Sequence, residues 1–270
     1  MMVLITGASG GLGRAMAVEC ARRGYDLFLT DMAQMPLMQI QQGIERQFGV
    51  NVYTKACDLT NDESLKELFG CMDSLNIKPG MLLNIAGIDY EGGFTTQPSG
   101  NIARIIQVNI EGTLKVTHAA LARRDKKERF IIVTVSSLAS MYPIPLKATY
   151  AASKRFLLDF SIALGQELKN ENVSVLALCP GGLPTTREAL LGIAAQGIWG
   201  DLTMNDLGEV ARKTMTAALK GKRVYIPGCV NTVLRFLGRL MPATLIARLL
   251  YKRWNSAQGK WNSIEAMRVS

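Results

Sequence analysis

The sequence predicts an α/β fold: a doubly wound, parallel, seven-stranded sheet with helices on both faces, followed by a C-terminal helical extension. Short apolar segments alternate with helical patterns along most of the 270 residues. Several of these segments are continuously apolar, which is typical of strands buried on both faces of a parallel sheet. No internal repeat or Ser/Pro/Gly linker interrupts the alternation. We therefore expect one domain over residues 1–228 and a basic, amphipathic extension over residues 229–270.

The expected elements follow one another in chain order. Strands are predicted at Val3–Thr6, Asp26–Thr30, Val52–Cys57, Met81–Ile85, Phe130–Val135, Val173–Leu178 and Val224–Ile226. Helices are predicted at Leu12–Arg23, Met35–Phe48, Asp62–Leu75, Ile102–Arg123, Tyr150–Lys169 and Leu207–Leu219. Right-handed crossovers between parallel strands then place helices on both faces of the sheet.

Composition and cysteine spacing exclude several classes of protein. Apolar residues make up 48% of the chain and charged residues 20%, which argues against a disordered or disulfide-stapled chain. The five cysteines show neither metal-ligand nor redox spacing, so we expect no metal site and reduced thiols in a cytoplasmic protein. Neither a secretory signal nor an apolar run long enough to span a membrane is recognised.

A Gly-rich segment connects the first predicted strand to the first predicted helix. From Thr6 to Gly13 it reads TGASGGLG. In this context the first glycine allows a tight turn, the second a close approach to a pyrophosphate, and the third close packing of helix on sheet. The free N–H groups of the helix start attract phosphate. The segment therefore predicts a Rossmann-like dinucleotide site that includes Gly7, Ser9, Gly10, Gly11, Leu12 and Gly13, whereas a plain Gly-rich turn is the alternative.

An acidic residue ends the second predicted strand, at the distance from the Gly-rich segment where dinucleotide-binding proteins hold the ribose. The carboxylate of Asp31 can accept hydrogen bonds from both ribose hydroxyls and would repel a 2′-phosphate. No Lys or Arg lies inside the Gly-rich segment, and Arg14 follows it. We therefore expect NAD as cofactor in preference to NADP. The alternative is that Asp31 caps the following turn.

Four further segments stand where strands end or helices begin. Cys57–Leu59 reads CDL, Asn84–Gly87 reads NIAG, Tyr150–Lys154 reads YAASK, and Pro180–Thr185 reads PGGLPT. Together with TGASGGLG, in this order, they make residues 2–227 resemble the short-chain dehydrogenase/reductase family. The family usually has Asn-Asn-Ala-Gly at the second segment, so Ile85 is a departure, and we assign it no polar role.

The resemblance implies two sets of site residues. The catalytic set falls on Asn109, Ser137, Tyr150 and Lys154. Beyond the Gly-rich segment and Asp31, the implied cofactor contacts are Asp58, Leu59, Asn84, Ala86, Gly87, Tyr150, Lys154, Pro180, Gly181 and Thr185. Asn109 is implied to fix a water that links Lys154 to solvent.

The chemistry of the Tyr/Lys pair supports the implied catalytic set. Tyr150 and Lys154 are four residues apart on one predicted helix, so they share a face. The pKa of a free phenol is near 10, and a neighbouring ammonium lowers it, a role we expect of Lys154. Tyr150 would then donate a proton to a carbonyl or remove one from an alcohol, while Ser137 stabilises charge on the substrate oxygen. A surface Tyr/Lys pair without function is the alternative.

Residues 183–204 are implied to form a substrate lid. They include Leu190, Ile193 and Ile198 with interspersed glycines, and Met141–Pro145 would add an apolar wall. We expect hydride transfer between a nicotinamide cofactor and a ketone or secondary alcohol on an apolar substrate, such as a hydroxysteroid or another lipid. The alternatives are an NADPH-dependent 3-oxoacyl reductase and a non-catalytic, membrane-associated nucleotide-binding protein. The lid residues alternatively pack only on one another.

The net charge of +9 is concentrated near the C-terminus. From Val210 to Ile264 there are eleven Lys and Arg and no acidic residue. Apolar residues repeat there at helical spacing, so residues 229–260 can lie on an anionic membrane surface or form a hairpin packed on protein. Nucleic acid is not expected, because no recognised binding motif is present. The helices Ile102–Arg123 and Tyr150–Lys169 resemble the family's dimer surface, which implies a homodimer or homotetramer.

Overall fold

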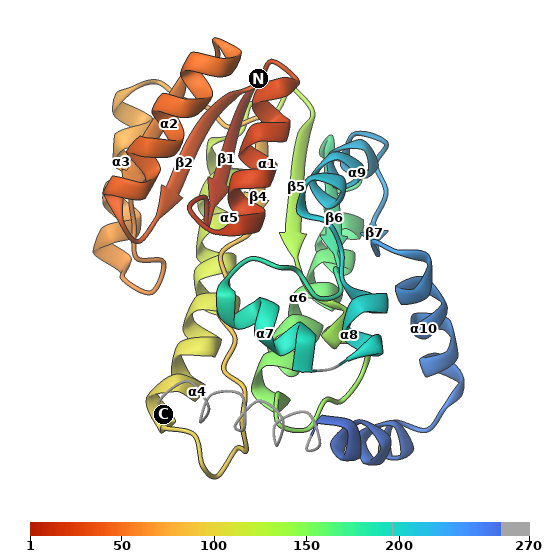
Figure 1. Cartoon of the computed structure of the whole chain (residues 1–270). Coiled ribbons are helices and arrows are strands. Elements are labelled where there is room, and N and C mark those ends of the chain that lie inside the picture. Colours follow the sequence, from red (N-terminus) through yellow and green to blue (C-terminus); the bar gives the residue numbers. More distant parts are fainter. Residues whose placement is uncertain (196, 255–270) are drawn as a thin grey trace.

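The computed structural model describes residues 1–195 and 197–254, which form a parallel sheet covered by helices (Figure 1). The described strands are β1 (Met2–Thr6), β2 (Asp26–Asp31), β3 (Val52–Ala56), β4 (Met81–Asn84), β5 (Phe130–Val135), β6 (Val173–Leu178) and β7 (Val224–Tyr225). Their order is β3-β2-β1-β4-β5-β6-β7, and all neighbouring strands are parallel. The predicted fold class is confirmed.

The strand order reverses between β1 and β4, which lie side by side in the middle of the sheet. Thr6, the last residue of β1, pairs with Thr30 of β2 on one side and with Asn84 of β4 on the other. In open parallel sheets, ligands bind outside the carboxyl ends of the strands at such a switch point. The sequence segments that carry chemistry all follow these strand ends.

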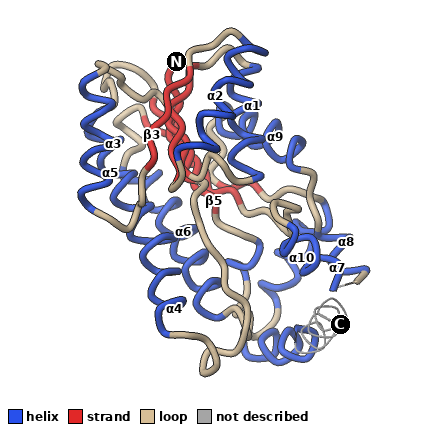
Figure 2. Tube along the Cα trace, turned by 60° about the vertical axis from the view of Figure 1, so that its left-hand side comes forward, coloured by secondary structure: helices blue, strands red, loops and turns tan. Residues whose placement is uncertain are grey.

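Two layers of helices enclose the sheet (Figure 2). One face is covered by α1 (Gly11–Arg22), α2 (Gln34–Phe48) and α9 (Leu207–Leu219), and the other by α3 (Asp62–Ser74), α5 (Thr113–Arg123) and α6 (Ala148–Glu167). Alternate residues of each strand feed the two cores, so that Val3 and Ile5 of β1 pack beneath α1 while Leu4 packs beneath α3 and α5. This burial on both faces accounts for the continuously apolar strands.

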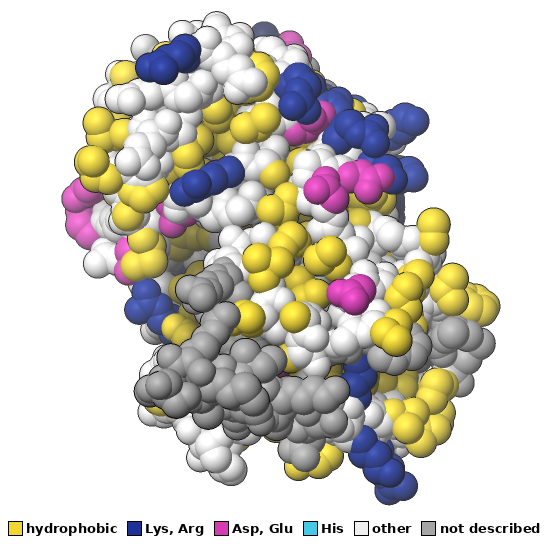
Figure 3. All heavy atoms as spheres, in the orientation of Figure 1, with side chains coloured by type: hydrophobic (Ala, Val, Ile, Leu, Met, Phe, Trp, Pro, Cys, Tyr) yellow, Lys and Arg dark blue, Asp and Glu magenta, His cyan; other side chains and the backbone are white. Residues whose placement is uncertain are grey.

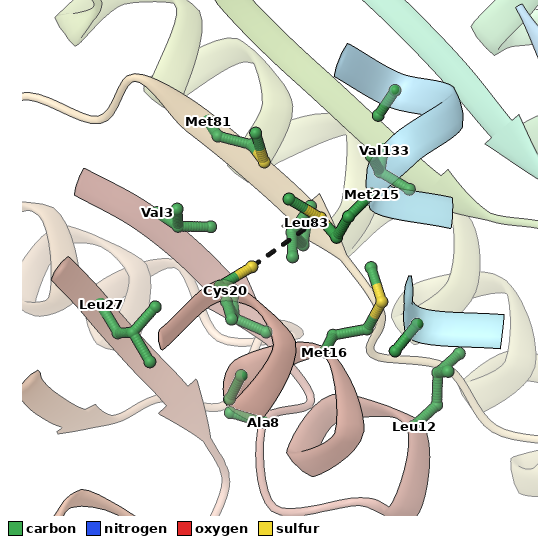
Figure 4. Packing of buried hydrophobic residues seen from close by; sticks show 14 of the residues in the cluster. Val3, Ala8, Leu12, Met16, Cys20, Leu27, Met81, Leu83, Val133 and Met215 are labelled. Atoms are coloured by element: carbon green, nitrogen blue, oxygen red, sulfur yellow. Dashed lines mark hydrogen bonds between the residues drawn. The ribbon is translucent and has the colours of Figure 1, made fainter. Parts of the chain in front are cut away.

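Sulfur atoms occupy part of the core beneath α1. Met16 and Cys20 of α1 face Met215 of α9, and the Cys20 Sγ lies 3.8 Å from the Met215 Sδ (Figure 4). Burial raises the pKa of the Cys20 thiol to about 12. Cys20 is therefore an inert, protonated core residue, and all five cysteines are free thiols, as the sequence predicted.

The predicted helix Ile102–Arg123 is interrupted, which corrects the sequence interpretation. It comprises α4 (Ser99–Ile106), a π-helical turn η1 (Gln107–Gly112) and α5. Within this turn, Asn109 is fully buried and both donates to and accepts from the backbone of Ile88. The turn widens the helix where this side chain must reach a neighbouring loop, as π-turns at functional sites commonly do.

The chain beyond β6 returns to the carboxyl edge of the sheet (Figure 1). There it forms α7 (Arg187–Ala195), α8 (Ile198–Thr203), α10 (Cys229–Leu240) and a last helical stretch over residues 243–254. Among the described residues, no helix is both long and apolar enough to cross a membrane. The part of the predicted extension beyond residue 254 lies outside the described residues, and the domain division at residue 228 stays a prediction.

Candidate active site

The Gly-rich segment forms a tight cradle at the end of β1. Gly7 has a φ of +65°, and a Cβ on it would lie 2.7 Å from the Ala86 backbone nitrogen. A Cβ on Gly13 would lie 2.1 Å from the Gly7 carbonyl oxygen. Side chains are thus sterically excluded, and α1 begins directly at the cradle. Such a helix start suits the pyrophosphate of a dinucleotide, so the residues present fit the predicted cofactor.

The segment PGGLPT lies against this cradle. A Cβ on Gly11 would lie 2.9 Å from the Thr185 Cα, so the loop after β6 passes directly over the start of α1. Residues separated by more than 170 positions in the sequence are thereby brought to one crevice. This places the predicted pyrophosphate and nicotinamide segments beside each other.

A cavity of about 1290 Å³ runs along the carboxyl edge of the sheet. Ligand pockets commonly occupy about 300–1,000 Å³, so this cavity can hold a dinucleotide and a second ligand together. The predicted residues that line it are Gly7, Ser9, Gly10, Gly11, Leu12, Gly13, Asp31, Asp58, Leu59, Ala86, Gly87, Ser137, Tyr150, Lys154, Pro180, Gly181 and Thr185. Only Asn84 and Asn109 of the predicted set lie outside its lining.

Asp31 joins β2 to the Gly-rich cradle. Its Oδ2 accepts hydrogen bonds from the Ser9 backbone nitrogen at 2.9 Å and from the Ser9 Oγ at 2.6 Å. Its Oδ1 accepts from the Met32 backbone nitrogen at 2.7 Å. The carboxylate therefore lines the cavity and caps the backbone that follows β2, and its contact with a ribose stays a prediction.

Asp58 is a second carboxylate in the lining of the cavity. It accepts hydrogen bonds from the backbone nitrogen and the Oγ1 of Thr60, at 2.9 and 2.8 Å. These bonds lower its pKa below the usual range of an aspartate, and the charge of Arg104 adds to the effect. Asp58 is thus held ionised at neutral pH.

The two predicted asparagines lie outside the lining of the cavity and form hydrogen bonds beside it. Asn84 donates from its Nδ2 to the Thr117 Oγ1 at 2.8 Å, which ties the end of β4 to α5. Asn109 accepts from the Ile88 nitrogen at 2.8 Å and donates to the Ile88 oxygen at 3.0 Å and to the Ser153 Oγ at 3.1 Å. Both side chains fix the loop after β4, and the predicted water contact of Asn109 stays a prediction.

The remaining three predicted catalytic residues meet at the carboxyl end of β5. Tyr150 lies in the first turn of α6, and its hydroxyl is close to the side chain of Ser137, which caps the short 3₁₀ helix η2 (Leu138–Met141). The buried Lys154 lies one turn further along α6, and its Nζ donates to the Val135 carbonyl at 2.9 Å. The Lys154 Nζ is 5.8 Å from the centre of the Tyr150 ring.

The pKa of Tyr150 is raised, whereas the sequence analysis expected it to be lowered. Burial, followed by the charge of Asp89, raises the pKa of Tyr150 to about 12, whereas Lys147 and the Ser137 side chain act to lower it. Burial also lowers the pKa of Lys154 to about 8. The physical reason is that both groups lie in a poorly hydrated interior, which disfavours their charged forms. Tyr150 is consequently held as a neutral acid in the ligand-free chain.

A charged group in the cavity that the sequence analysis missed lies beside Tyr150. The Lys147 Nζ lies 2.6 Å from an Asp89 oxygen and 3.1 Å from a Glu91 oxygen. Burial lowers the pKa of Lys147, but the two carboxylates more than compensate and raise it overall. One signal was present in the sequence: Lys147 precedes Tyr150 by three residues and therefore shares its side of the helix start.

Apolar residues form part of the wall of the cavity. Ile144, Leu183 and Ile193 line it from the predicted wall and lid, and Leu234, Met241, Ile246, Leu250 and Trp254 line it from the C-terminal segment. The lid residues therefore do not pack only on one another. The described part of the extension packs partly on the domain, which helical spacing alone could not distinguish from membrane contact.

Arranged around one cavity, these groups define a class of protein: oxidoreductases that bind a nicotinamide dinucleotide and use a Tyr/Lys pair. The family follows from comparison. Residues 1–192 match the family described as short chain dehydrogenase, and the chain belongs to that family. The predicted membership, and with it the NAD(P)-dependent class of enzyme, is confirmed at the level of the family.

Comparison with curated proteins identifies relatives of this chain within the family. It is 32% identical over 176 residues to the very-long-chain 3-oxoacyl-CoA reductase of Laccaria bicolor, covering 64% of this chain and 52% of the relative. It is 31% identical over 216 residues to the protein of that name from Coccidioides immitis, covering 76% and 61% respectively. The chain thus spans only about half to three-fifths of the length of these relatives.

Solved structures share the fold. A short-chain dehydrogenase from Sphingobium yanoikuyae in complex with NADPH has a TM-score of 0.73 at 25% identity, over 98% of this chain and 95% of that one. A 3-oxoacyl-[acyl-carrier protein] reductase with bound NAD from Brucella melitensis has a TM-score of 0.72 at 22% identity, over 84% and 89%. The latter likeness concerns the fold alone. Because one neighbour holds NADPH and the other NAD, the fold accommodates either cofactor.

Proposed function

We propose that this protein reduces the ketone of an apolar, 3-oxoacyl type of substrate to a secondary alcohol. The observation that carries the proposal is the meeting of Ser137, Tyr150 and Lys154 at the wall of a cavity that apolar residues also line. The names of the curated relatives favour a 3-oxoacyl substrate over the hydroxysteroid that the sequence analysis put first. Apolar walls suit an acyl chain, and the neighbouring hydroxyls suit its ketone.

The nicotinamide cofactor supplies the hydride when it is bound. The Ser137 and Tyr150 hydroxyls, which lie close to each other, would both donate to the ketone oxygen and orient it. As the carbonyl carbon gains the hydride, Tyr150 delivers its proton to the oxygen, which completes the alcohol. The pKa of Tyr150, about 12, leaves this proton on the hydroxyl at neutral pH, so Tyr150 is able to donate it.

Lys154 would stabilise the charge that Tyr150 acquires in this step. Its ammonium lies 5.8 Å from the phenol ring, and a cation at that position favours the phenolate once the proton has left. Because burial lowers its pKa to about 8, the ammonium is protonated at neutral pH and loses charge above that value. The proposed reduction should therefore weaken as the pH rises through about 8.

For the cofactor we propose NADH. Asp31 lines the cavity at the end of β2, where its negative charge would oppose the 2′-phosphate of NADPH. Ser9 and Met32 hold this carboxylate in position through three hydrogen bonds. The NAD-bound neighbour is consistent with the proposal, and the NADPH-bound neighbour provides the competing cofactor for the test.

We also propose a homodimer and a peripheral, cytoplasmic membrane protein. Ile106, Phe156 and Ile162 are exposed on α4 and α6, the helices that resemble the family's dimer surface, and such residues favour a second copy of the chain. Exposed apolar and basic residues on α10 and residues 243–254 favour an anionic membrane.

The proposed activity is tested by measuring oxidation of NADH and NADPH with 3-oxoacyl-CoA thioesters and with 3-ketosteroids. We expect turnover of the thioesters, a preference for NADH, and a loss of at least about 100-fold in kcat for Tyr150→Phe with unchanged NADH affinity. Full activity of that variant would refute the role of Tyr150. Turnover of steroids alone would refute the substrate class, and NADH binding without any turnover would favour a non-catalytic protein.

A further inference from the structure

The last described helix presents two different faces. Ile246, Leu250 and Trp254 are spaced four residues apart and all line the cavity. Leu245, Arg248 and Lys252 point outward and are exposed. One side of residues 243–254 is therefore part of the interior of the site, and the other side is part of the molecular surface.

Trp254 is connected to the catalytic tyrosine through a single ammonium group. The Lys147 Nζ lies 5.0 Å from the centre of the Trp254 ring and 5.8 Å from the centre of the Tyr150 ring. A cation within about 6 Å of a ring centre is attracted by the ring's electrons. Lys147 thus holds the end of the C-terminal helix at a fixed place relative to the reacting groups.

The position of Lys147 is itself fixed by ion pairs. Asp89 and Glu91, both in the loop after β4, contact its ammonium at 2.6 and 3.1 Å. Its side chain is only 15% exposed. Because two carboxylates already engage this ammonium, it serves as an anchor for the aromatic ring, and the surface next to it that meets a ligand is the apolar face of residues 246–254.

We infer that the inner face of residues 243–254 closes the substrate end of the cavity and that Trp254, held by Lys147, limits the length of the apolar chain that binds there. The inference rests on the proposed function and specifies its substrate. A chain whose ketone lies at Ser137 and Tyr150 would extend among apolar lining residues such as Leu250, and the indole ring would limit how far it can extend. Shortening residue 254 would extend the chamber in the direction in which the chain runs.

The test compares Trp254→Ala, Trp254→Phe and Leu245→Ala in a homologous series of 3-oxoacyl thioesters of increasing chain length. We expect Trp254→Ala to move the optimum of kcat/KM to longer chains, with a change of about tenfold or more for the longest members, because each methylene in a fitted pocket counts strongly. Trp254→Phe keeps an aromatic ring for Lys147 and should shift the optimum less. Leu245 lies on the outer face and does not line the cavity, so its variant should retain the original optimum.

A binding measurement separates this inference from the proposed activity. The same chain-length series is titrated calorimetrically into the NADH complexes of Tyr150→Phe and of Tyr150→Phe/Trp254→Ala, in which turnover does not interfere. If the double variant binds longer chains best, Trp254 limits the chain length, and this holds even if the unmodified chain proves inactive with these ketones. Identical chain-length profiles, or no binding of any member, would overturn it. If Trp254→Ala and Leu245→Ala shift the chain-length optimum equally, then any disturbance of this helix changes the cavity and Trp254 has no specific role.

Discussion

At the scale of single residues, the surroundings of Tyr150 show how position decides reactivity. The Nζ of Lys154, four residues away, donates to the Val135 carbonyl, and the charges of Asp89 and Lys147 have the largest electrostatic effects on the pKa of the phenol. A carboxylate nearby raises the pKa of a phenol and an ammonium lowers it. After burial, the Asp89–Lys147 pair therefore has the largest effect on how readily Tyr150 gives up its proton.

This pair predicts opposite pH shifts for two substitutions. Lys147→Met removes a charge that lowers the pKa of Tyr150, so the rise with pH of alcohol oxidation should move to higher pH. Asp89→Asn removes a charge that raises it, so the rise should move to lower pH. The measurement is kcat/KM against pH in the oxidation direction, with Lys66→Met on the exposed face of α3 as control. Shifts in the same direction would contradict the assignment.

At the scale of elements, the turn between β1 and α1 shows why a local sequence pattern can be trusted. Its glycines are required by atoms of the same short segment and of the adjacent loop: the Gly13 position meets the Gly7 oxygen, and the Gly7 position meets Ala86. Some glycines inside other helices have no such neighbours. Gly43, within α2, has no atom within 4 Å of the place where a Cβ would be.

This contrast predicts effects of opposite sign for the same type of substitution. Gly13→Ala should lower the free energy of unfolding by about 1–3 kcal/mol, because the added methyl group overlaps backbone that cannot move freely. Its affinity for NADH should fall as well. Gly43→Ala should raise the free energy of unfolding by about 1 kcal/mol, since alanine is the better helix former. Urea unfolding of the two variants checks both values, and a Gly13→Ala protein as stable as the unmodified chain would disprove the steric argument.

At the scale of the whole molecule, apolar and basic side chains gather on one edge. In Figure 3, apolar side chains lie along the edge formed by α8 and α10, with Lys and Arg side chains below them. Phe236 and Ile198 are 65% and 76% exposed, and Arg248 and Lys252 are exposed on the last helix. Met241 and Leu249 are both exposed and part of the cavity lining, so the chamber opens on this edge. An apolar substrate could therefore enter directly from a lipid surface.

The edge predicts binding to anionic vesicles. The chain should pellet with vesicles of phosphatidylcholine and phosphatidylserine more than with phosphatidylcholine alone. Arg248→Gln/Lys252→Gln should weaken binding by roughly fivefold for each charge, since each basic residue near anionic lipid contributes about 1 kcal/mol. Phe236→Ser should weaken it too. Matched controls are Phe94→Ser, equally exposed at 65% but remote in sequence, and Lys126→Gln/Lys127→Gln. Equal pelleting of all variants would argue against membrane contact. The exposed edge would then be expected to bind a second copy of the chain.

Much of the fold and of the site was determined by the sequence itself. Strands such as Val3–Thr6 and Phe130–Val135 are apolar without alternation because both of their faces are buried, and this signal is local. The Gly-rich segment and the Tyr150/Lys154 spacing are also local, since their geometry follows from a few consecutive residues. The parallel sheet, the cofactor cradle and the Tyr150/Lys154 pair were therefore predictable, and the family resemblance added Ser137.

Other features were decided only by the tertiary structure, because they depend on residues distant in sequence. The π-turn around Asn109 exists to reach Ile88, and the pKa of Tyr150 depends on Asp89 and on burial. The orientation of the last helix is also decided by tertiary packing. Ile246 lines the cavity, whereas its neighbour Leu245 is exposed at the surface. The spacing of apolar residues predicts that one face of a helix is buried. Only the tertiary structure determines which part of the protein, or which partner, buries it.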